Sequence, residues 1–358
     1  MSPLGQLDLD AGSRVLVVAP HPDDESLVTG GLLLRALRAG AVVHVAYFTD
    51  GENNPWAQRA FERRWRVGPG DRARFGELRR SEALAALAEL GVSPDAVTFL
   101  RWPDQGVTDI LRRADETPLS SLAAVFSSFR PTVVVGPSVA DLHPDHSAVA
   151  VLVRLALARR TDVRHLEAAV HHPDLRQLGR GALLIASTAE EREHKLAAVL
   201  HHQSQMMWRR GWLRAFVDRD EAFWDATGAV AVAHPVCQVG QTEGVLVVAV
   251  RSAPRLRACG RRRLLIVGHD AAGHLACLAA DLPVLSGSAP VITAGSSPRV
   301  GLAHYRGGPR RGAVRIEGAP VVGFEPLFVK VERRFGFFDE AGWAPLPLPS
   351  ATARPARV

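Results

Sequence analysis

Residues 14–20 read RVLVVAP, and this short apolar run decides the fold class. A continuous valine-rich run without alternating polar residues is typical of a strand that is buried on both faces of a sheet. Leucines at helical spacing follow in residues 25–39, Gly40 ends that helix, and residues 41–49 (AVVHVAYFT) form the next strand. A strand, a helix and a second strand in this order predict a parallel, right-handed βαβ unit.

The alternation of strands and helices continues along the chain as far as about residue 202. We expect helices at 71–90, 119–129, 147–159 and 188–202, strands at 97–100, 132–135, 165–171 and 182–186, and a long polar loop at 50–70. Beyond residue 228 the pattern changes to strand-like runs between Gly, Ser and Pro turns, at 245–250, 263–267, 291–294 and 319–330. We therefore predict an α/β fold, namely a Rossmann-like, mostly parallel sheet flanked by helices, with a C-terminal β-rich domain or extension. The predicted boundaries are 1–228 for the α/β domain, 229–345 for the β-rich domain of unknown role, and 346–358 for a flexible tail.

Length and composition exclude several classes of protein. The chain has 358 residues, of which 47% are hydrophobic and 22% charged, and these values exclude a mainly disordered or fibrous chain. Its apolar runs are far shorter than the roughly 20 residues that a membrane span needs. The first twelve residues contain Asp8 and Asp10 and no apolar stretch, so we expect no signal peptide and a cytoplasmic protein.

The positive charge does not indicate a nucleic-acid partner. The formal net charge is +6, but the chain has only two lysines, Lys195 and Lys330, and its arginines are scattered along the sequence. A nucleic-acid interface normally shows a basic stripe or patch. The three cysteines, Cys237, Cys259 and Cys277, lack metal-ligand spacing, so we expect buried free thiols.

Two clusters of His and Asp follow two of the predicted strands. The first strand ends in His-Pro-Asp-Asp-Glu (21–25), and the fourth is followed by Asp-Leu-His-Pro-Asp-His (141–146). Ligands of open α/β sheets bind beyond the carboxyl ends of the strands, so both clusters are expected at one edge. A lone His-Pro-Asp is common as a turn or a helix cap, but two after buried strands favour a shared site. The absence of a Gly-rich turn after the first strand excludes a dinucleotide-binding protein.

This combination of residue types suits metal-assisted hydrolysis. A catalytic zinc takes three protein ligands and leaves a position open for water, whose pKa it lowers to about 7. Hydrolysis of an amide also needs a carboxylate that removes the proton from the water and an acid that protonates the departing nitrogen. The two clusters contain enough His and Asp side chains for all of these functions.

The stretch 15–31 (VLVVAPHPDDESLVTGG), followed by Thr-Asp-Gly-Glu at 49–52 and His-Pro-Asp-His at 143–146, resembles the LmbE-like, or PIG-L, family of zinc-dependent de-N-acetylases. The resemblance covers about residues 14–205. It includes Arg-Arg-Ser-Glu at 79–82, Trp-Pro-Asp at 102–104, Lys195, and Ser-Gln at 204–205. The family typically removes the acetyl group from an N-acetylglucosamine unit of a larger conjugate. The resemblance therefore implies that residues 1–228 are a catalytic domain acting on a small-molecule amino-sugar conjugate.

Carried over by position, the resemblance implies that His21, Asp24 and His146 bind the metal, normally Zn²⁺. Because His₂Asp sites bind both metals, Fe²⁺ is an alternative. Asp23 is then the general base for the attacking water. His143 is expected to stabilise the oxyanion or to protonate the leaving amine.

Three further positions follow from the resemblance. Asp145 is expected to orient His143, and Arg79 and Asp104 match positions that hold the sugar hydroxyls. The branch acting on mycothiol precursors has a tyrosine two residues before the first His of the second motif. This chain has Asp141 there, which speaks against that substrate.

The sequence leaves several readings open. The enzyme could cleave a different N-acyl substrate, such as a mycothiol conjugate or an acyl amine of secondary metabolism, or the chain could be a carbohydrate-binding protein without catalysis. Trp56 and Trp65 form a lid, a platform on which a sugar stacks, or a packed part of their loop. The paired histidines at 171–172 and 201–202 are expected to be structural or surface residues, because adjacent side chains seldom face the same ligand. The oligomeric state, a homo-oligomer included, is not specified.

Overall fold

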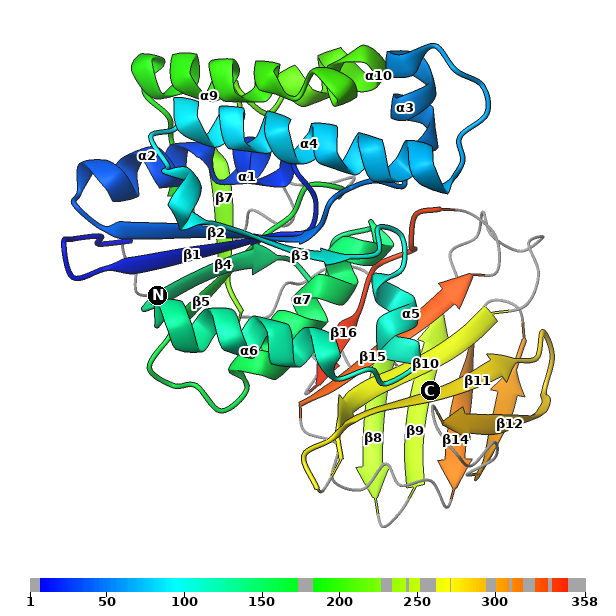
Figure 1. Ribbon diagram of the computed structural model, residues 1–358. Helices are drawn as coiled ribbons and strands as arrows, with labels where there is room; N and C mark the ends of the chain where they lie inside the picture. The colour runs from blue at the N-terminus through cyan, green and yellow to red at the C-terminus, as the bar shows by residue number, and fades with distance from the viewer. Residues whose placement is uncertain are drawn as a thin grey trace.

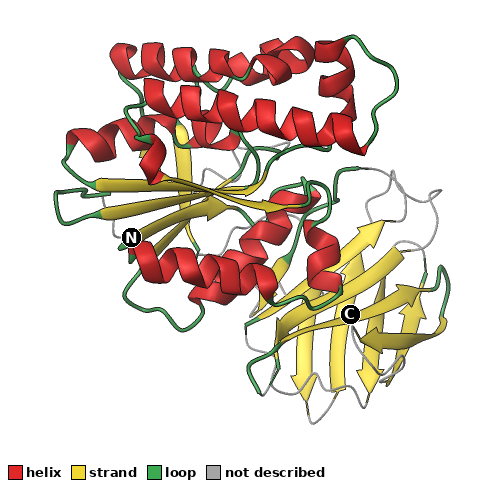
Figure 2. Cartoon of the chain, viewed as in Figure 1, coloured by secondary structure: helices red, strands yellow, loops and turns green. Residues whose placement is uncertain are grey.

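The computed structural model describes residues 7–172, 183–226, 234–242, 245–251, 262–270, 272–293, 301–308, 311–317, 326–333 and 337–346. Within these residues the chain forms two sheets, one covered by helices and one built from antiparallel strands (Figures 1 and 2). Cys259 and nearly all of the predicted tail 346–358 lie outside the described residues. Cys277 is buried as expected, whereas Cys237 is exposed, so the expectation of a buried thiol is wrong for Cys237.

The first sheet has seven strands in the order β3-β2-β1-β4-β5-β7-β6. Their bounds are Arg14–Ala19 (β1), Val42–Thr49 (β2), Val97–Trp102 (β3), Val133–Pro137 (β4), Arg164–Ala168 (β5), Leu183–Ile185 (β6) and Glu221–Asp225 (β7). The strands β1 to β5 pair in parallel, and β7 and β6 complete the sheet in antiparallel pairs. This confirms the predicted Rossmann-like, mostly parallel sheet. The chain order reverses between β1 and β4, which is where sheets of this kind bind their ligands.

Helices cover both faces of this sheet (Figure 1). One face carries α1 (Asp24–Val28), α2 (Gly30–Arg38), α3 (Pro55–Glu62), α4 (Pro69–Glu89), α9 (Ala189–His201) and α10 (Gln203–Arg214). The other carries α5 (Val107–Arg112), α6 (Thr117–Phe129) and α7 (Pro144–Leu157), while a short 3-10 turn, η1, spans Pro94–Ala96. The buried valines of β1 contact both layers, as their continuous apolar pattern predicts.

The structure differs from the sequence-based expectation in two helical segments. Residues 50–70 are not one loop, because Asn54 caps a helix by accepting a hydrogen bond from the amide of Ala57 at 3.2 Å. The helix expected over 25–39 is two helices that meet at Thr29. The buried carboxylate of Glu221 accepts hydrogen bonds from the amides of Gly31 and Leu32, at 2.8 and 2.9 Å, and thereby caps the start of the second.

The second sheet has nine strands in the order β16-β15-β10-β11-β12-β13-β14-β9-β8. Their bounds are Val236–Thr242 (β8), Val245–Arg251 (β9), Arg262–His269 (β10), Leu275–Leu282 (β11), Gly287–Thr293 (β12), Gly301–Gly307 (β13), Arg311–Glu317 (β14), Leu327–Arg333 (β15) and Ala344–Leu346 (β16). All of its pairs are antiparallel, which confirms the β-rich C-terminal region. The expected strand at 319–330 begins only at Leu327, and residues 318–325 lie outside the described part.

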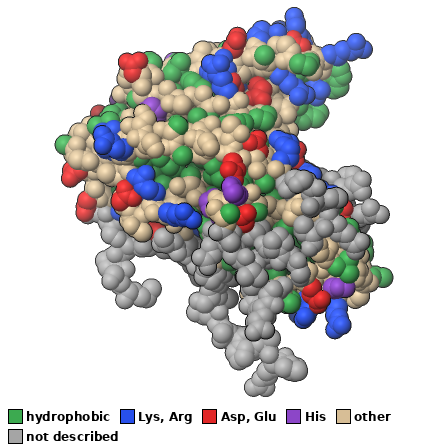
Figure 3. All heavy atoms as spheres, turned by 60° about the horizontal axis from the view of Figure 1, so that its bottom comes forward, with side chains coloured by type: hydrophobic (Ala, Val, Ile, Leu, Met, Phe, Trp, Pro, Cys, Tyr) green, Lys and Arg blue, Asp and Glu red, His purple; other side chains and the backbone are tan. Residues whose placement is uncertain are grey.

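The two sheets share part of their hydrophobic core. The cluster around α7 includes Leu265, Val267 and Phe328 from the second sheet, and Trp343, which directly precedes β16. The division of the chain near residue 228 into two domains therefore stays a proposal. In the described residues, no helix combines the length and the apolar character that a membrane span requires. Charged side chains of both signs are spread over the face shown in Figure 3.

Candidate active site

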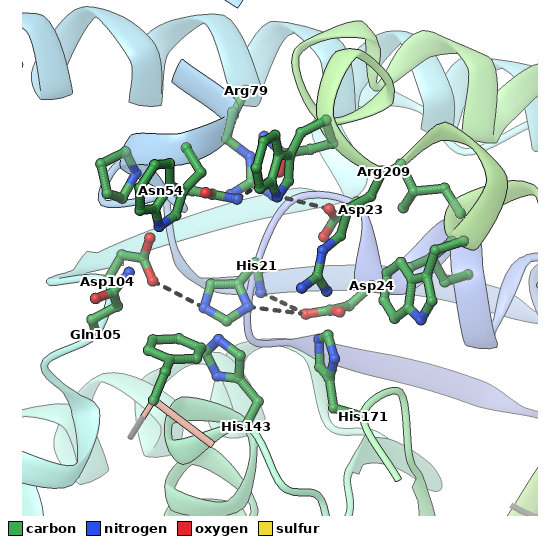
Figure 4. A pocket seen from close by; sticks show the side chains of 18 of the residues that line it. His21, Asp23, Asp24, Asn54, Arg79, Asp104, Gln105, His143, His171 and Arg209 are labelled. Atoms are coloured by element: carbon green, nitrogen blue, oxygen red, sulfur yellow. Dashed lines mark hydrogen bonds and ion pairs between the residues drawn. The ribbon is translucent and has the colours of Figure 1, made fainter. Parts of the chain in front are cut away.

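The two His/Asp clusters meet at the carboxyl ends of β1 and β4, and Figure 4 shows the pocket where they lie. His21 and Asp24 lie between the end of β1 and the first turn of α1. In the second cluster, Pro144 begins α7, and the imidazole of His143 caps it by accepting a hydrogen bond from the amide of Asp145 at 3.2 Å. That cap places His146 in the first turn of α7, directly opposite the first cluster.

Three potential ligand atoms form a compact triangle. The Nδ1 of His21 lies 3.1 Å from the Nε2 of His146 and 3.3 Å from the Oδ2 of Asp24, and the last two atoms are 3.2 Å apart. Three ligands bound at about 2.0–2.1 Å in tetrahedral geometry lie about 3.3 Å from one another. The three side chains are at most 9% exposed. The donor set and its spacing therefore fit a zinc or iron(II) ion.

The outer nitrogen of each histidine is hydrogen-bonded to a carboxylate. The Nε2 of His21 lies 3.1 Å from Asp104 Oδ1, and the Nδ1 of His146 lies 3.2 Å from Asp141 Oδ2. Such bonds fix the orientation of the ring and leave the lone pair of the inner nitrogen free for a metal. Burial lowers the pKa of His146, but Asp24 and Asp141 outweigh it and raise that pKa to about 10. The electrostatics of the site thus favour a positive charge at this position.

Asp23, the expected base, lies beside this triangle and lines the cavity. Its carboxylate is 3.1 Å from the guanidinium of Arg79, and its side chain is 14% exposed. Burial raises the pKa of Asp23 to about 6, against the opposing charge of Arg79. The backbone of Asp23 has φ 145° and ψ −29°, a conformation that a non-glycine residue adopts only under strain.

Asp145 differs from the expectation that its carboxylate orients His143. The carboxylate accepts hydrogen bonds from the amides of Gln105 and Val107, at 2.5 and 3.2 Å, and lies 3.5 Å from the Nε2 of His21. It is the backbone amide of Asp145 that contacts His143. The reason is the helix cap: the Nδ1 of His143 satisfies a free amide of the first turn of α7.

Arg79 and Asp104, expected to hold sugar hydroxyls, both line the cavity but also make protein contacts. Arg79 donates hydrogen bonds to the carbonyl oxygens of Gly51 and Pro22, at 2.8 and 2.5 Å. Gly51 has φ +63°, and a Cβ there would lie 1.8 Å from the Arg79 guanidinium, so this close approach requires glycine. Asp104 accepts a hydrogen bond from the amide of Asn53 at 2.8 Å besides its contact with His21. Contact of either side chain with a sugar stays a prediction.

Two residues of the site were missed by the sequence interpretation. Asp141 is fully buried and accepts hydrogen bonds from the amides of His143, Val170 and His171, at 2.8, 2.8 and 3.0 Å, in addition to its contact with His146. His171, expected to be structural or exposed, lines the cavity, with its ring centroid 5.1 Å from that of His146. Both follow from the strand order, because β5 lies beside β4 and ends at the same edge. The second histidine pair, at 201–202, fits the structural expectation, because His202 is buried and pairs with Glu25 at 3.1 Å.

The triangle opens into a cavity of about 410 Å³. Trp56, on α3, lines this cavity and stacks on Trp208 of α10, with ring centroids 5.9 Å apart and an interplanar angle of 15°. Trp65 is 77% exposed. Of the two tryptophans singled out in the sequence, it is Trp56 that contributes to the site.

Comparison with known proteins finds similarity in the part of the chain that contains the two His/Asp clusters. Residues 16–157 match the family model PIG-L, described as GlcNAc-PI de-N-acetylase. This part of the chain is a PIG-L family domain. It contains most of β1, all of β4 and both His/Asp clusters.

Two relatives carry the name 1D-myo-inositol 2-acetamido-2-deoxy-alpha-D-glucopyranoside deacetylase. The protein from Gordonia bronchialis is 33% identical over 189 residues, which cover 45% of this chain and 64% of the relative. The protein from Mycolicibacterium vanbaalenii is 37% identical over 170 residues, covering 42% and 56%. The match thus spans less than two thirds of either relative. A solved structure of a deacetylase triple mutant involved in the teicoplanin biosynthetic pathway is 25% identical and covers 60% of this chain and 97% of its own, with a TM-score of 0.48.

Proposed function

We propose that this protein is a metal-dependent de-N-acetylase that removes the acetyl group from an N-acetylglucosamine-type conjugate and releases a free amine and acetate. The observation that carries this proposal is the triangle of His21 Nδ1, Asp24 Oδ2 and His146 Nε2, with sides of 3.1–3.3 Å, beside the carboxylate of Asp23. The names of the PIG-L relatives support an acetylated amino sugar as the substrate.

The roles of the residues follow from their positions. His21, Asp24 and His146 would hold a zinc or iron(II) ion, which would supply a water of lowered pKa and polarise the amide carbonyl. Asp23 lines the cavity next to the ligands and accepts the proton of the attacking water. Arg79 holds the Asp23 carboxylate in place through the 3.1 Å ion pair.

His143 faces the same cavity in a defined tautomer. Its Nδ1 accepts the hydrogen bond from the amide of Asp145, so the ring proton resides on Nε2. Burial, together with the neighbouring His146, holds the pKa of His143 well below its ordinary value, which favours the neutral ring. We infer that His143 stabilises the developing oxyanion as a hydrogen-bond donor, rather than acting first as an acid.

The test is acetate release from a panel of N-acetylglucosamine conjugates, with zinc-loaded and chelator-stripped protein in parallel. Metal-dependent release that Asp23→Ala lowers by roughly 10²–10⁴-fold supports the proposal. His146→Ala should lower the bound metal. His201→Ala, on the outer surface of α9 where His201 pairs with Glu89, is the matched control and should keep both metal and activity.

The other outcomes separate the alternatives. Metal bound in stoichiometric amount without acetate release contradicts the N-acetyl substrate and favours another N-acyl amine. Neither metal nor release contradicts the enzyme altogether and favours a carbohydrate-binding protein.

A further inference from the structure

Aromatic side chains make up a large share of the cavity lining. Five of the nineteen lining residues are Trp or Phe, although aromatic residues make up only 6% of the chain. The five are Trp56, Trp208, Trp212, Phe337 and Phe338. Phe337 and Phe338 are 45% and 38% exposed, so part of each side chain is available to a ligand. Apolar side chains left exposed in a concave site are typical of a binding surface.

Phe337 and Phe338 come from the β-rich region, more than 300 residues after the first His/Asp cluster. They lie between β15 and β16, outside the part of the chain that matches the PIG-L family. The ring of Phe337 is 4.9 Å from that of His143, and the ring of Phe338 is 6.1 Å away. The β-rich region thus supplies a wall of the site next to a residue to which we assign a role in the chemistry.

Segment 337–343 is fixed firmly to the loop that precedes α7. The amide of Asp339 donates to the carbonyl of Leu142, and the amide of Trp343 donates to the carbonyl of Val139, both at 2.8 Å. Asp339 also forms a 2.6 Å ion pair with Lys330, whose side chain is 1% exposed. These contacts hold the two phenylalanines in a defined position rather than leaving them on a free surface.

Segment 337–343 requires a glycine where it lies closest to the loop that precedes α7. Gly342 has φ +68°, and a Cβ on it would lie 2.1 Å from the carbonyl oxygen of Val139. A side chain at this position would push the segment away from the loop and displace Phe337 and Phe338 from the cavity.

The arrangement of the rings indicates the shape of their ligand. Phe337 and Phe338 are nearly perpendicular, with an interplanar angle of 84° and centroids 5.1 Å apart. A flat ring that enters this corner stacks on one phenylalanine and meets the edge of the other, the two favoured geometries of aromatic pairs. Sugar hydroxyls need polar partners, and these lie elsewhere in the cavity, at Arg79, Asp104 and Asn54.

We propose that Phe337 and Phe338 determine substrate specificity by binding a flat, apolar ring attached to the amino sugar, so that the substrates are aryl-type N-acetylglucosamine conjugates. This inference rests on the proposed function, because it places the sugar amide at the triangle of His21, Asp24 and His146. The β-rich region then belongs to the substrate-binding site.

The experiment compares kcat/KM for the phenyl and methyl β-glycosides of N-acetylglucosamine. The wild type should prefer the phenyl glycoside by roughly tenfold or more, as expected for one well-placed aromatic contact. Phe337→Ala/Phe338→Ala should reduce this preference to less than about threefold. Leu285→Ala removes a 65% exposed side chain from the same β-rich region, outside the cavity lining, and should leave the preference unchanged.

A second pair of measurements keeps the inference falsifiable. Phe337→Leu/Phe338→Leu retains apolar volume without the rings, so it tests the rings even if the alanine variant folds poorly. Calorimetric binding of the phenyl glycoside to the metal-loaded protein separates the two proposals. Binding that the leucine variant weakens, without acetate release by the wild type, supports the ring site and contradicts the deacetylase. Equal rates on both glycosides, or a phenyl preference that survives both double variants, overturn the ring site and leave the deacetylase standing.

Discussion

Two substitutions of Asp23 separate the effect of its strained backbone on stability from the effect of its carboxylate on activity. At φ 145° a side chain is disfavoured, and such a residue costs about 1–3 kcal/mol. Glycine tolerates this conformation, so Asp23→Gly removes the strain, whereas Asp23→Ala keeps it. Both variants lose the carboxylate and leave Arg79 without that partner, so these effects cancel in the comparison.

The expected difference follows from two opposing terms. Relief of strain favours the glycine variant by about 1–3 kcal/mol, and the greater freedom of glycine in the unfolded chain disfavours it by roughly 0.5–1 kcal/mol. Asp23→Gly should therefore be more stable than Asp23→Ala, by about 1 kcal/mol at the middle of both ranges and by at most about 2.5 kcal/mol. At an ordinary helical position the sign is the opposite, and Ala124→Gly, exposed within α6, should destabilise the protein by about 1 kcal/mol.

The assay is urea unfolding of the wild type and of these three variants under identical conditions, with acetate release measured in parallel. Asp23→Gly and Asp23→Ala should be equally inactive while differing in stability. An alanine variant as stable as the glycine variant, or more so, would refute the strain at Asp23. Activity retained in either variant would refute its role as the base.

The remaining predictions concern the pH dependence of stability, the cysteines and the shared core. Burial lowers the pKa of His165 to about 4; between that value and about 6.5 the unfolded chain binds more protons, so the free energy of unfolding falls as the pH falls. In urea titrations at several pH values, His165→Gln should reduce this fall by up to roughly 3 kcal/mol, and an unchanged slope would contradict a neutral imidazole in the folded protein. In a Cys259→Ser background, the exposed Cys237 should react with a thiol reagent at pH 8. Burial raises the pKa of Cys277 to about 12, so Cys277 should react only after unfolding. Equal reaction rates of the two thiols would contradict the burial of Cys277. A fragment that ends at residue 228 should aggregate, because it lacks the side chains of the β-rich sheet that pack on α7, and a monomeric fragment in light scattering would show that this contact is dispensable.

Local patterns of the sequence were sufficient to predict that the two His/Asp clusters lie together. The run before His21 can only be a buried strand, and the His/Asp clusters after β1 and β4 had to meet because parallel strands end at the same edge. The position of His171 was predictable in principle from the same rule. It was missed because His171 and His172 are adjacent, and adjacent side chains seldom face the same ligand.

The aromatic wall could not be predicted from local patterns. Phe337 and Phe338 follow a strand that pairs with β10, and their approach to His143 depends on how a nine-stranded sheet packs on α7. Periodicity identifies strands and buried faces, but it carries no information on which loop of one sheet meets which loop of another. The helix α3 is an intermediate case, since Asn54-Pro55 is a recognisable helix start within an otherwise polar segment.

The loop before α7 explains why the β-rich region and the chemistry are not separable. On one side, the carboxylate of Asp141 accepts hydrogen bonds from the amides of Val170 and His171, which follow β5. On the other side, the carbonyl of Val139 accepts a hydrogen bond from the amide of Trp343, and the carbonyl of Leu142 accepts one from the amide of Asp339. The loop that presents His143 is therefore held between the two sheets, whereas the loop that presents His21 and Asp24 is held within the first. Removal of the β-rich region would free one side of the His143 loop as well as the aromatic wall, so loss of activity in a truncated chain cannot by itself distinguish recognition from catalysis. The paired glycosides make that distinction, because they change the ring on the substrate and leave the loop intact.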